Sequence, residues 1–326
     1  MKKTISILMA ALLMGSASAT AQNKDSVLFE ALADTQRVAV APMEQVDRMP
    51  VVFVQKENGF HLAGILFRPV NRKPGEKLKA IIVDGPMYSV KEQPQSLYAQ
   101  ILASKGYATL VFDHSYIGSS EGHPRGYEDP EIKGADERAA VDFLVSQPDI
   151  DANHIGAVGI CGGGVYVPNG LRNDRRVKAI ASVVPFIMMQ DVRTASDEEL
   201  RAMEEEYKRS GKVARLDLIH GSEGEAYYRN PNRGAALQNI PTPAWSQLEW
   251  HKFHPQERVK ELKVPYLVIA GERAFTLQSA KTMYDNAPQP KYWHLTKGAS
   301  HFEMYDIDKY VKENTNVILD FFAKNL

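Results

Sequence analysis

The sequence has a single cysteine in 326 residues, which excludes an intramolecular disulfide and a cysteine-rich structural zinc site. It also lacks an excess of either charge, because 39 Lys and Arg residues balance 40 Asp and Glu residues. Binding to nucleic acid or to an anionic membrane depends on a basic excess, so the composition argues against both. With 44% hydrophobic and 24% charged residues, the chain is typical of a globular protein with a sizeable core.

The one long apolar run lies at the N-terminus. Two lysines precede an apolar stretch over residues 5–14, and small residues follow it. This order predicts a cleaved signal peptide over residues 1–21, with cleavage after Ala19 or Ala21. The stretch is too short to span a bilayer, which takes roughly 20 residues. We therefore expect a periplasmic or secreted protein without a stable membrane anchor, with its folded domain over residues 22–326.

Beyond that segment, short apolar runs alternate with amphipathic segments. Near-continuous apolar runs are typical of strands buried on both faces of a parallel sheet, with helices between them. A Glu-Asn-Gly turn between the first two runs predicts an antiparallel hairpin at one edge. The pattern therefore predicts an α/β fold with a mostly parallel central sheet flanked by helices. The expected strands cover residues 51–54, 61–67, 80–83, 107–112, 155–160, 179–184, 265–270 and 292–295.

A long insert over about residues 191–257 interrupts this alternation. Inserts of that length within a compact domain are usually functional, and we expect this one to form a lid over the carboxyl ends of the strands. It carries two of the three tryptophans, Trp245 and Trp250, which we expect to line an apolar substrate pocket. The alternative is that these rings only attach the insert to the body of the domain.

A Gly-x-Cys-x-Gly turn follows the strand expected at residues 155–160. Its sequence, Gly159 to Gly163 with Cys161 at the centre, has the form of a nucleophile elbow in which cysteine replaces serine. The turn would place the Gly162 N–H at a helix N-terminus, where it could hold an oxyanion and favour thiolate over thiol. The alternative is a buried structural cysteine.

His301 follows the last expected strand, in the sequence Gly298-Ala299-Ser300-His301. That position suits the final member of the chain order nucleophile, acid, histidine. An imidazole there could accept the thiol proton and later donate it to the leaving group. A surface histidine without a catalytic role is the alternative.

Several linked motifs together resemble those of bacterial α/β-hydrolases, over about residues 50–326. The nearest branch is that of the dienelactone-hydrolase-like proteins, beside the acyl hydrolases and the X-Pro peptidases. The resemblance implies the α/β-hydrolase fold more strongly than any substrate, because this fold supports many reactions. The motifs are Val90-Lys91-Glu92-Gln93, Phe112-Asp113-His114-Ser115-Tyr116, Ser120-Glu121-Gly122-His123-Pro124-Arg125, Tyr127-Glu128-Asp129-Pro130, the Cys161 elbow and the His301 segment.

The chain departs from the family pattern in the loop that should supply the second oxyanion-hole donor. A His-Pro-Gly-Gly-Gly stretch is common there, whereas this sequence reads Gly85-Pro86-Met87-Tyr88-Ser89. Proline has no N–H, so Met87 is the expected donor. Tyr88 replaces a glycine and is expected to narrow the substrate pocket.

The second departure concerns the catalytic acid. The usual Gly-x-x-Asp after the fifth parallel strand reads Gly271-Glu272-Arg273-Ala274, so alanine stands where aspartate is expected. Three possibilities stay open: Glu272 as the acid, Asp191 after the preceding strand, or no carboxylate partner for the histidine.

These residues together predict a hydrolase that cleaves an ester, lactone or other activated acyl compound. Cys161 would attack, Met87 and Gly162 would hold the oxyanion, and His301 would transfer the proton. The reaction needs no cofactor and no metal, and its partner is a small-molecule substrate; the oligomeric state is not predicted. The alternatives are a peptidase of the X-Pro type and a non-catalytic binding protein on a hydrolase scaffold.

Overall fold

The computed structural model describes residues 37–73 and 75–326. The predicted signal peptide, residues 1–21, lies outside the described residues. Residues 39–326 form one compact unit, which carries every feature discussed below. No helix in the described part of the chain is both long and apolar enough to cross a membrane.

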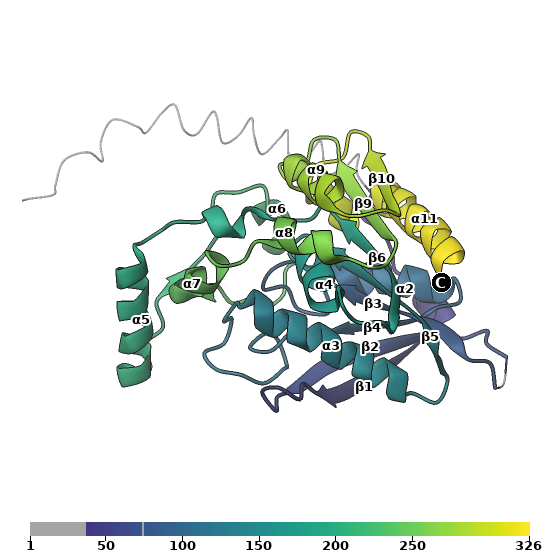
Figure 1. The fold of residues 1–326 in the computed structure, drawn as a ribbon, viewed down its shortest axis with the longest axis horizontal. Coiled ribbons are helices and arrows are strands. Elements are labelled where there is room, and N and C mark those ends of the chain that lie inside the picture. The colour runs from purple at the N-terminus through teal and green to yellow at the C-terminus, as the bar shows by residue number, and fades with distance from the viewer. Residues whose placement is uncertain (1–36, 74) are drawn as a thin grey trace, which may run out of the picture. The chain divides into compact units, whose positions relative to one another are not determined.

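An eight-stranded sheet forms the centre of this unit (Figure 1). Its strand order is β1-β2-β4-β3-β5-β6-β9-β10; the β1–β2 and β2–β4 pairs are antiparallel, and the remaining pairs are parallel. Each expected strand is present, and the predicted fold class is confirmed. The strands are β1 (Val46–Val54), β2 (His61–Pro69), β3 (Leu78–Asp84), β4 (Ala108–Phe112), β5 (Ile150–Ile160), β6 (Val177–Val183), β9 (Tyr266–Gly271) and β10 (Lys291–Thr296).

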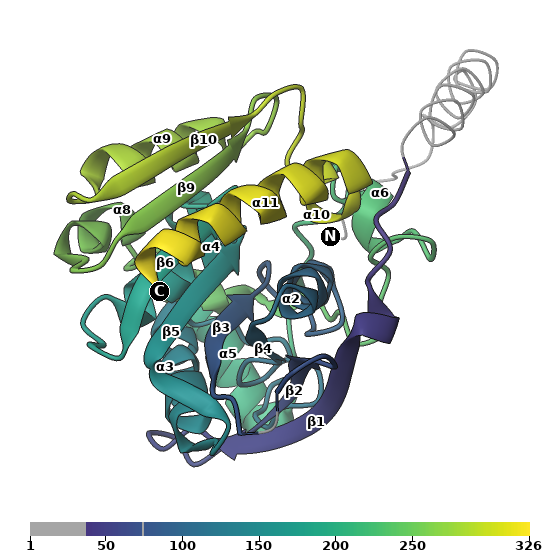
Figure 2. The same cartoon turned by 90° about the vertical axis from the view of Figure 1, so that its right-hand side faces the viewer.

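Helices cover both faces of the sheet, as the near-continuous burial of β3 to β6 and β9 requires (Figure 2). Right-handed crossovers place α2 on one face and α3, α4 and α9 on the other, and α11 packs beside α2. The helices are α2 (Pro94–Ser104), α3 (Pro130–Ser146), α4 (Gly163–Leu171), α9 (Leu277–Asn286), α10 (Glu303–Asp306) and α11 (Asp308–Asn325).

Helix α4, which follows Cys161, contains a proline, a residue that usually kinks or ends a helix. Pro168 cannot donate to the carbonyl of Gly164, four residues earlier. The Ser182 hydroxyl on β6 donates to that carbonyl instead, at 2.7 Å. The neighbouring strand therefore compensates the missing bond, and the helix continues to Leu171.

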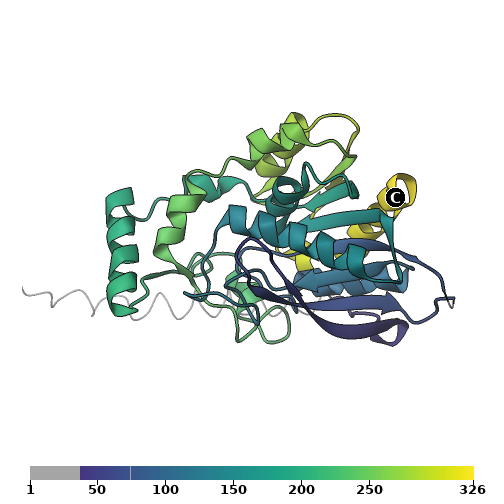
Figure 3. The same ribbon diagram turned by 60° about the horizontal axis from the view of Figure 1, so that its bottom comes forward.

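The insert between β6 and β9 is made of short elements, and its charged helix α5 projects away from the sheet (Figure 3). A capping box of Ser196 and Glu199 begins α5, and Gly211 ends it with φ 76°. The elements of the insert are η2 (Met188–Asp191), α5 (Asp197–Ser210), β7 (Arg215–Leu216), α6 (Glu225–Tyr228), β8 (Thr242–Pro243), η3 (Ala244–Ser246), α7 (Gln247–Trp250), α8 (Pro255–Arg258) and η4 (Val259–Glu261).

Candidate active site

A cavity of about 480 Å³ lies at the carboxyl ends of the parallel strands, where α/β folds bind ligands. Its wall is mostly apolar, and both Cys161 and His301 lie on it. The loops after β3, β5, β6, β9 and β10 all contribute, together with the insert. The lining residues used below are Met87, Tyr88, Cys161, Leu218, Ile219, Tyr228, Phe275, His301 and Tyr305.

Cys161 occupies a strained turn between β5 and α4. Its φ of 56° lies in the left-handed region, which side chains other than glycine rarely adopt. The flanking glycines are required by close contacts. A Cβ on Gly159 would lie 2.0 Å from the carbonyl oxygen of Gly163, and a Cβ on Gly163 would lie 2.7 Å from Asp84 Oδ2. The predicted elbow is therefore present, with the sulfur at the floor of the cavity.

Two backbone amides point at this sulfur. The N–H groups of Met87 and Gly162 both hydrogen-bond Cys161 Sγ. The loop that carries Met87 is held to the elbow because Gly163 N–H donates to the Gly85 carbonyl at 2.8 Å. These are the two amides that the sequence predicted as oxyanion donors, and both lie beside the thiol.

The protonation state of Cys161 differs from the sequence-based expectation. Burial raises the pKa of the thiol to about 11, although interactions with the Tyr305 hydroxyl and with the amides of Gly162 and Met87 act in the opposite direction. The prediction that the helix N-terminus makes thiolate the favoured form is therefore wrong. Cys161 rests as a neutral thiol because its site excludes water.

His301 is also neutral, because burial lowers its pKa to about 3. Its Nδ1 lies 2.8 Å from Thr276 Oγ1, in the loop after β9. A hydroxyl thus stands where hydrolases of this fold place a carboxylate. The sequence offered no signal for Thr276, because it lies two residues beyond the alanine at the expected acid position.

The two carboxylates considered as the acid lie elsewhere. Glu272 is exposed, and its Oε2 accepts a hydrogen bond from the Gly298 N–H at 2.8 Å. It therefore stabilises the loop that precedes His301 and not the imidazole itself. Asp191 is exposed at the end of η2. The expectation that Glu272 orients His301 is therefore corrected: Thr276 holds the imidazole, which leaves the third possibility, a histidine without a carboxylate partner.

Tyr305 is a site residue that the sequence analysis missed. Its hydroxyl lies 2.9 Å from His301 Nε2 and also hydrogen-bonds the Cys161 thiol. It therefore stands between the two predicted catalytic side chains. The available signal was only its position four residues after His301, in the short helix that begins at Glu303.

The insert does line the cavity, but not through its tryptophans. Trp250 is fully buried, and its indole N–H donates to the Glu128 carbonyl at 3.2 Å, while Trp245 stacks on Tyr207 of α5 with ring centroids 5.4 Å apart. Both predicted substrate contacts are wrong: Trp250 attaches the insert to the domain, and Trp245 packs within the insert. Tyr88, the third predicted contact, is buried and lines the cavity. The insert contributes Val192, Leu218, Ile219, Ser222, Glu223 and Tyr228 to the wall.

A buried charged network lies behind the oxyanion loop. Asp84 Oδ1 accepts the Gly85 N–H at 2.7 Å and lies 3.0 Å from His114 Nε2, while His114 Nδ1 lies 3.1 Å from Asp136. Burial alone would lower the pKa of His114, but the facing Asp84 charge raises it to about 9. Glu137, also fully buried, has its pKa raised by burial and by the Asp84 charge. The Asp84 charge thus favours the imidazolium form of His114, and burial together with that charge favours the protonated form of Glu137.

This network also contains donor atoms of the kind that bind metals. Oxygen and nitrogen atoms of Asp84, His114 and Glu137 lie within 4.8 Å of one another. Both ring nitrogens of His114 face carboxylates at hydrogen-bond distance, and the charged ring has no lone pair to offer. The geometry therefore fits shared protons better than a cation.

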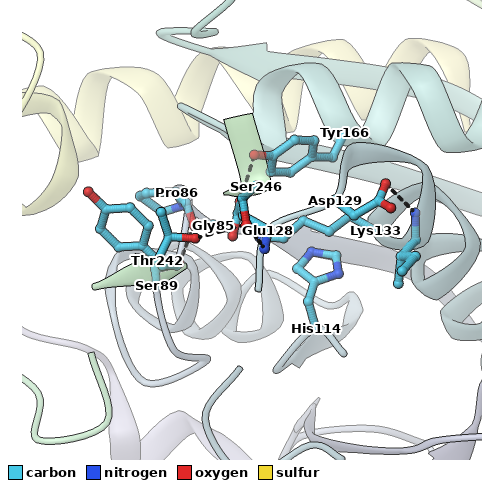
Figure 4. Close-up of polar contacts among 12 residues, drawn as sticks. Gly85, Pro86, Ser89, His114, Glu128, Asp129, Lys133, Tyr166, Thr242 and Ser246 are labelled. Atoms are coloured by element: carbon cyan, nitrogen blue, oxygen red, sulfur yellow. Dashed lines mark hydrogen bonds and ion pairs between the residues drawn. The ribbon is translucent and has the colours of Figure 1, made fainter. Parts of the chain in front are cut away.

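A second part of the network joins the insert to the domain (Figure 4). The Tyr166 hydroxyl on α4 and the Lys133 ammonium on α3 both lie 2.7 Å from Glu128 Oε1. The Glu128 N–H donates to Ser246 of the insert at 3.0 Å. Tyr166 lies on the helix that follows Cys161. Glu128 therefore links this helix to the insert, because it contacts both Tyr166 and Ser246.

The strand order, the elbow and the cavity at the carboxyl ends of the strands define an α/β-hydrolase. Comparison with known proteins agrees: residues 58–303 match the model of the X-Pro dipeptidyl-peptidase family, S15, and the chain belongs to this family. The hydrolase resemblance inferred from the motifs is thereby confirmed. Membership of the dienelactone-hydrolase-like branch stays a prediction.

Individual relatives are similar over most of the chain. The protein PA2218 of Pseudomonas aeruginosa is 34% identical over 80% of this chain and 77% of its own length. The crystal structure of PA2218 superposes with a TM-score of 0.80, covering 89% of this chain and 99% of that one. A thiohydrolase of Eupenicillium brefeldianum is 24% identical over 80% of this chain and 89% of its own. The Est1E structure from Butyrivibrio proteoclasticus with bound ferulic acid shares the fold, with 16% identity and a TM-score of 0.61.

Proposed function

We propose that the protein is a cysteine-dependent acyl hydrolase that cleaves thioesters and other activated esters carrying an apolar acyl group. Cys161 Sγ attacks the acyl carbon, and its proton passes to His301 Nε2. The tetrahedral oxyanion sits between the N–H groups of Met87 and Gly162, and its collapse releases the thiol or alcohol. Water then hydrolyses the acyl–Cys161 thioester and restores the thiol.

The observation that carries this proposal is the convergence of both amide donors on the sulfur at the floor of an apolar cavity. A buried structural cysteine needs neither donor. Removing one oxyanion donor from a hydrolase costs about 100- to 1000-fold in kcat, so a preformed pair favours catalysis over simple binding.

The chemistry of the base favours activated substrates. Thr276 offers His301 a hydroxyl, which stabilises an imidazolium less than a carboxylate would. Such a histidine suits leaving groups that depart with little proton donation, as thiolates do and amines do not. The name of the relative from Eupenicillium brefeldianum, a thiohydrolase, supports the same class.

A panel of acyl thioesters and matched oxygen esters of increasing chain length tests the proposal. We expect thioester turnover, a mass shift of one acyl group on Cys161, and loss of both in Cys161→Ala. Binding of the acyl compounds without turnover and without the mass shift would identify a non-catalytic binding protein instead.

The family model favours a second candidate, a peptidase of the X-Pro type. Such an enzyme must bind a peptide amino terminus and expel an amine. Glu223 on the cavity wall could pair with an ammonium group, but Thr276 offers His301 no carboxylate to stabilise the imidazolium that must protonate a leaving amine. Release of a chromogenic amine from a dipeptide ending in proline, equal to thioester turnover, would favour the peptidase.

We also propose export after removal of residues 1–21, on the basis of the N-terminal sequence. Cell fractionation should place the protein outside the cytoplasm. Its mature N-terminus should follow Ala19 or Ala21, and an intact Met1 on the exported form would contradict cleavage.

A further inference from the structure

We propose that the Tyr305 hydroxyl relays the proton between Cys161 and His301, and is itself a catalytic group. The inference rests on the proposed nucleophile and base. It is motivated by the position of the Tyr305 hydroxyl, which lies 2.9 Å from His301 Nε2 and also interacts with the Cys161 thiol.

Tyr305 is placed for this role by short-range structure. It lies on α10, one helical turn after His301, and its ring is fully buried. A phenolic hydroxyl can accept one hydrogen bond while it donates another. The resting arrangement is therefore a chain in which the Cys161 thiol donates to Tyr305 Oη and Tyr305 donates to His301 Nε2.

Thr276 fixes the direction of this chain. Because His301 Nε2 accepts from Tyr305, the neutral ring carries its proton on Nδ1 and donates it to Thr276 Oγ1 at 2.8 Å. This tautomer leaves the Nε2 lone pair free to take a proton from Tyr305. Thr276 is thus a positioning residue that acts through the histidine.

The relay solves a problem that the two neutral side chains create. A stable thiolate–imidazolium pair is unfavourable here, because burial opposes both charges. As Sγ bonds to the acyl carbon, its proton moves to Tyr305 Oη and the Tyr305 proton moves to His301 Nε2. The Tyr305 O–H bond is thereby renewed, and the positive charge appears only when the oxyanion balances it. The reverse transfers let Tyr305 protonate the leaving group.

The insert holds the relay in place. Tyr228 on α6 hydrogen-bonds Tyr305, and both rings line the cavity. Tyr228 packs edge-on against Tyr305 with ring centroids 6.4 Å apart. The contact between Tyr228 and Tyr305 therefore connects the insert that lines the cavity to the proposed proton path.

The competing interpretation is that Tyr305 only fills the space that substrate later occupies, after which Cys161 and His301 meet directly. The two interpretations predict opposite effects of Tyr305→Phe. Loss of a relay slows the reaction, whereas loss of a blocking hydroxyl leaves it unchanged or accelerates it.

Alkylation of Cys161 by iodoacetamide at pH 7 tests the relay without a substrate, because this is the only thiol in the sequence. We expect Tyr305→Phe and His301→Ala to slow alkylation of the folded protein by similar factors of at least about 10-fold. The double variant should be little slower than either single one, since both remove the same path. Tyr266→Phe is the matched control: it removes a buried hydroxyl that bonds Ser182, away from the cavity.

A wild-type rate in Tyr305→Phe, with His301→Ala slowed, would overturn the relay and leave the Cys161–His301 pair intact. The reverse failure is also distinguishable: Tyr305-dependent alkylation without turnover of any acyl compound would overturn the proposed function alone. Should Tyr305→Phe not fold, rates of the wild-type protein in mixtures of H2O and D2O decide the matter. Two protons in motion give a curved dependence on deuterium fraction, and a straight line would contradict the relay.

Discussion

At the scale of single residues, the site combines a thiol and an imidazole that are both uncharged. Cys161 has a pKa of about 11 and His301 a pKa of about 3, so neither titrates across the neutral range. Because both shifts come chiefly from burial, they follow from the apolar wall of the cavity rather than from a partner charge.

This state predicts an unusual pH profile. For a thioester substrate we expect kcat/KM to be level from about pH 5 to about pH 9, because the base stays deprotonated above its lowered pKa and the thiol stays protonated. Steady-state rates over that range check the prediction. A bell-shaped profile centred near neutrality would instead reveal a thiolate–imidazolium pair.

A serine in place of Cys161 should be poorly activated. Its hydroxyl is far less acidic than a thiol, and Thr276 cannot stabilise the imidazolium as a carboxylate would. We expect Cys161→Ser to lower kcat/KM by at least about 100-fold, the size of a lost general-base contribution. Adding Thr276→Asp to the serine variant should restore part of the loss. Full activity of Cys161→Ser alone would show that another group already stabilises the histidine.

At the scale of elements, the insert has two separate tasks. Its tryptophans pack against the domain and against α5, whereas the segment before α6 reaches the cavity through Leu218 and Ile219. Stability and substrate choice should therefore respond to different substitutions within one insert.

Trp250→Ala should cost about 3–5 kcal/mol of unfolding free energy, as expected for a fully buried large ring, with little change in the preferred acyl chain length. Leu218→Ala and Ile219→Ala should shift that preference toward longer chains and move the melting temperature little. Melting curves and the thioester panel measure both quantities on the same variants. If Trp250→Ala changed the preferred acyl chain length and left the stability unchanged, Trp250 would contact the substrate, contrary to this prediction.

The elements themselves were predictable because each depends on short-range patterns. Strand β5, the glycines of the elbow and the position of His301 all follow from local sequence. What escaped prediction depends on three-dimensional packing: Thr276 and Tyr305 become site residues only because β9 and α10 bring them beside the imidazole. Trp245 misled because an aromatic ring suits packing within the insert as well as a pocket wall.

At the scale of the whole molecule, the buried charges connect the oxyanion loop to the helix-covered core. Asp84 ends β3, His114 follows β4, and Glu137 lies on α3, so three consecutive parts of the fold meet at one cluster. As a carboxylate, Glu137 would find no donor for either oxygen among residues 37–73 and 75–326. A proton on Glu137 lets it donate to Asp84, which in turn fixes the Gly85 N–H.

This cluster predicts a loss of stability at alkaline pH. The folded-state pKa values of Glu137 and His114 are both raised, the latter from 6.5 to about 9. A group with a raised pKa stabilises the fold fully below its unfolded-state pKa and loses that contribution as pH rises through the folded-state pKa. We therefore expect the unfolding free energy to fall as pH rises, from about pH 4.5 upward for Glu137 and between pH 6.5 and 9 for His114, by up to about 1.4 kcal/mol per pH unit for each proton involved.

Glu137→Gln separates the two groups. The amide imitates the protonated carboxyl group, so the variant should match the wild type near pH 4 and become progressively more stable than it at higher pH. The contribution of His114 to the pH dependence should remain in this variant. Its unfolding free energy should therefore still fall at alkaline pH, but less steeply than that of the wild type. Denaturant unfolding at a series of pH values measures the difference, with Glu44→Gln on the exposed surface as the control. Parallel curves for wild type and Glu137→Gln would mean that Glu137 holds no proton in the folded protein, and that the oxyanion loop is fixed by His114 and Asp84 alone.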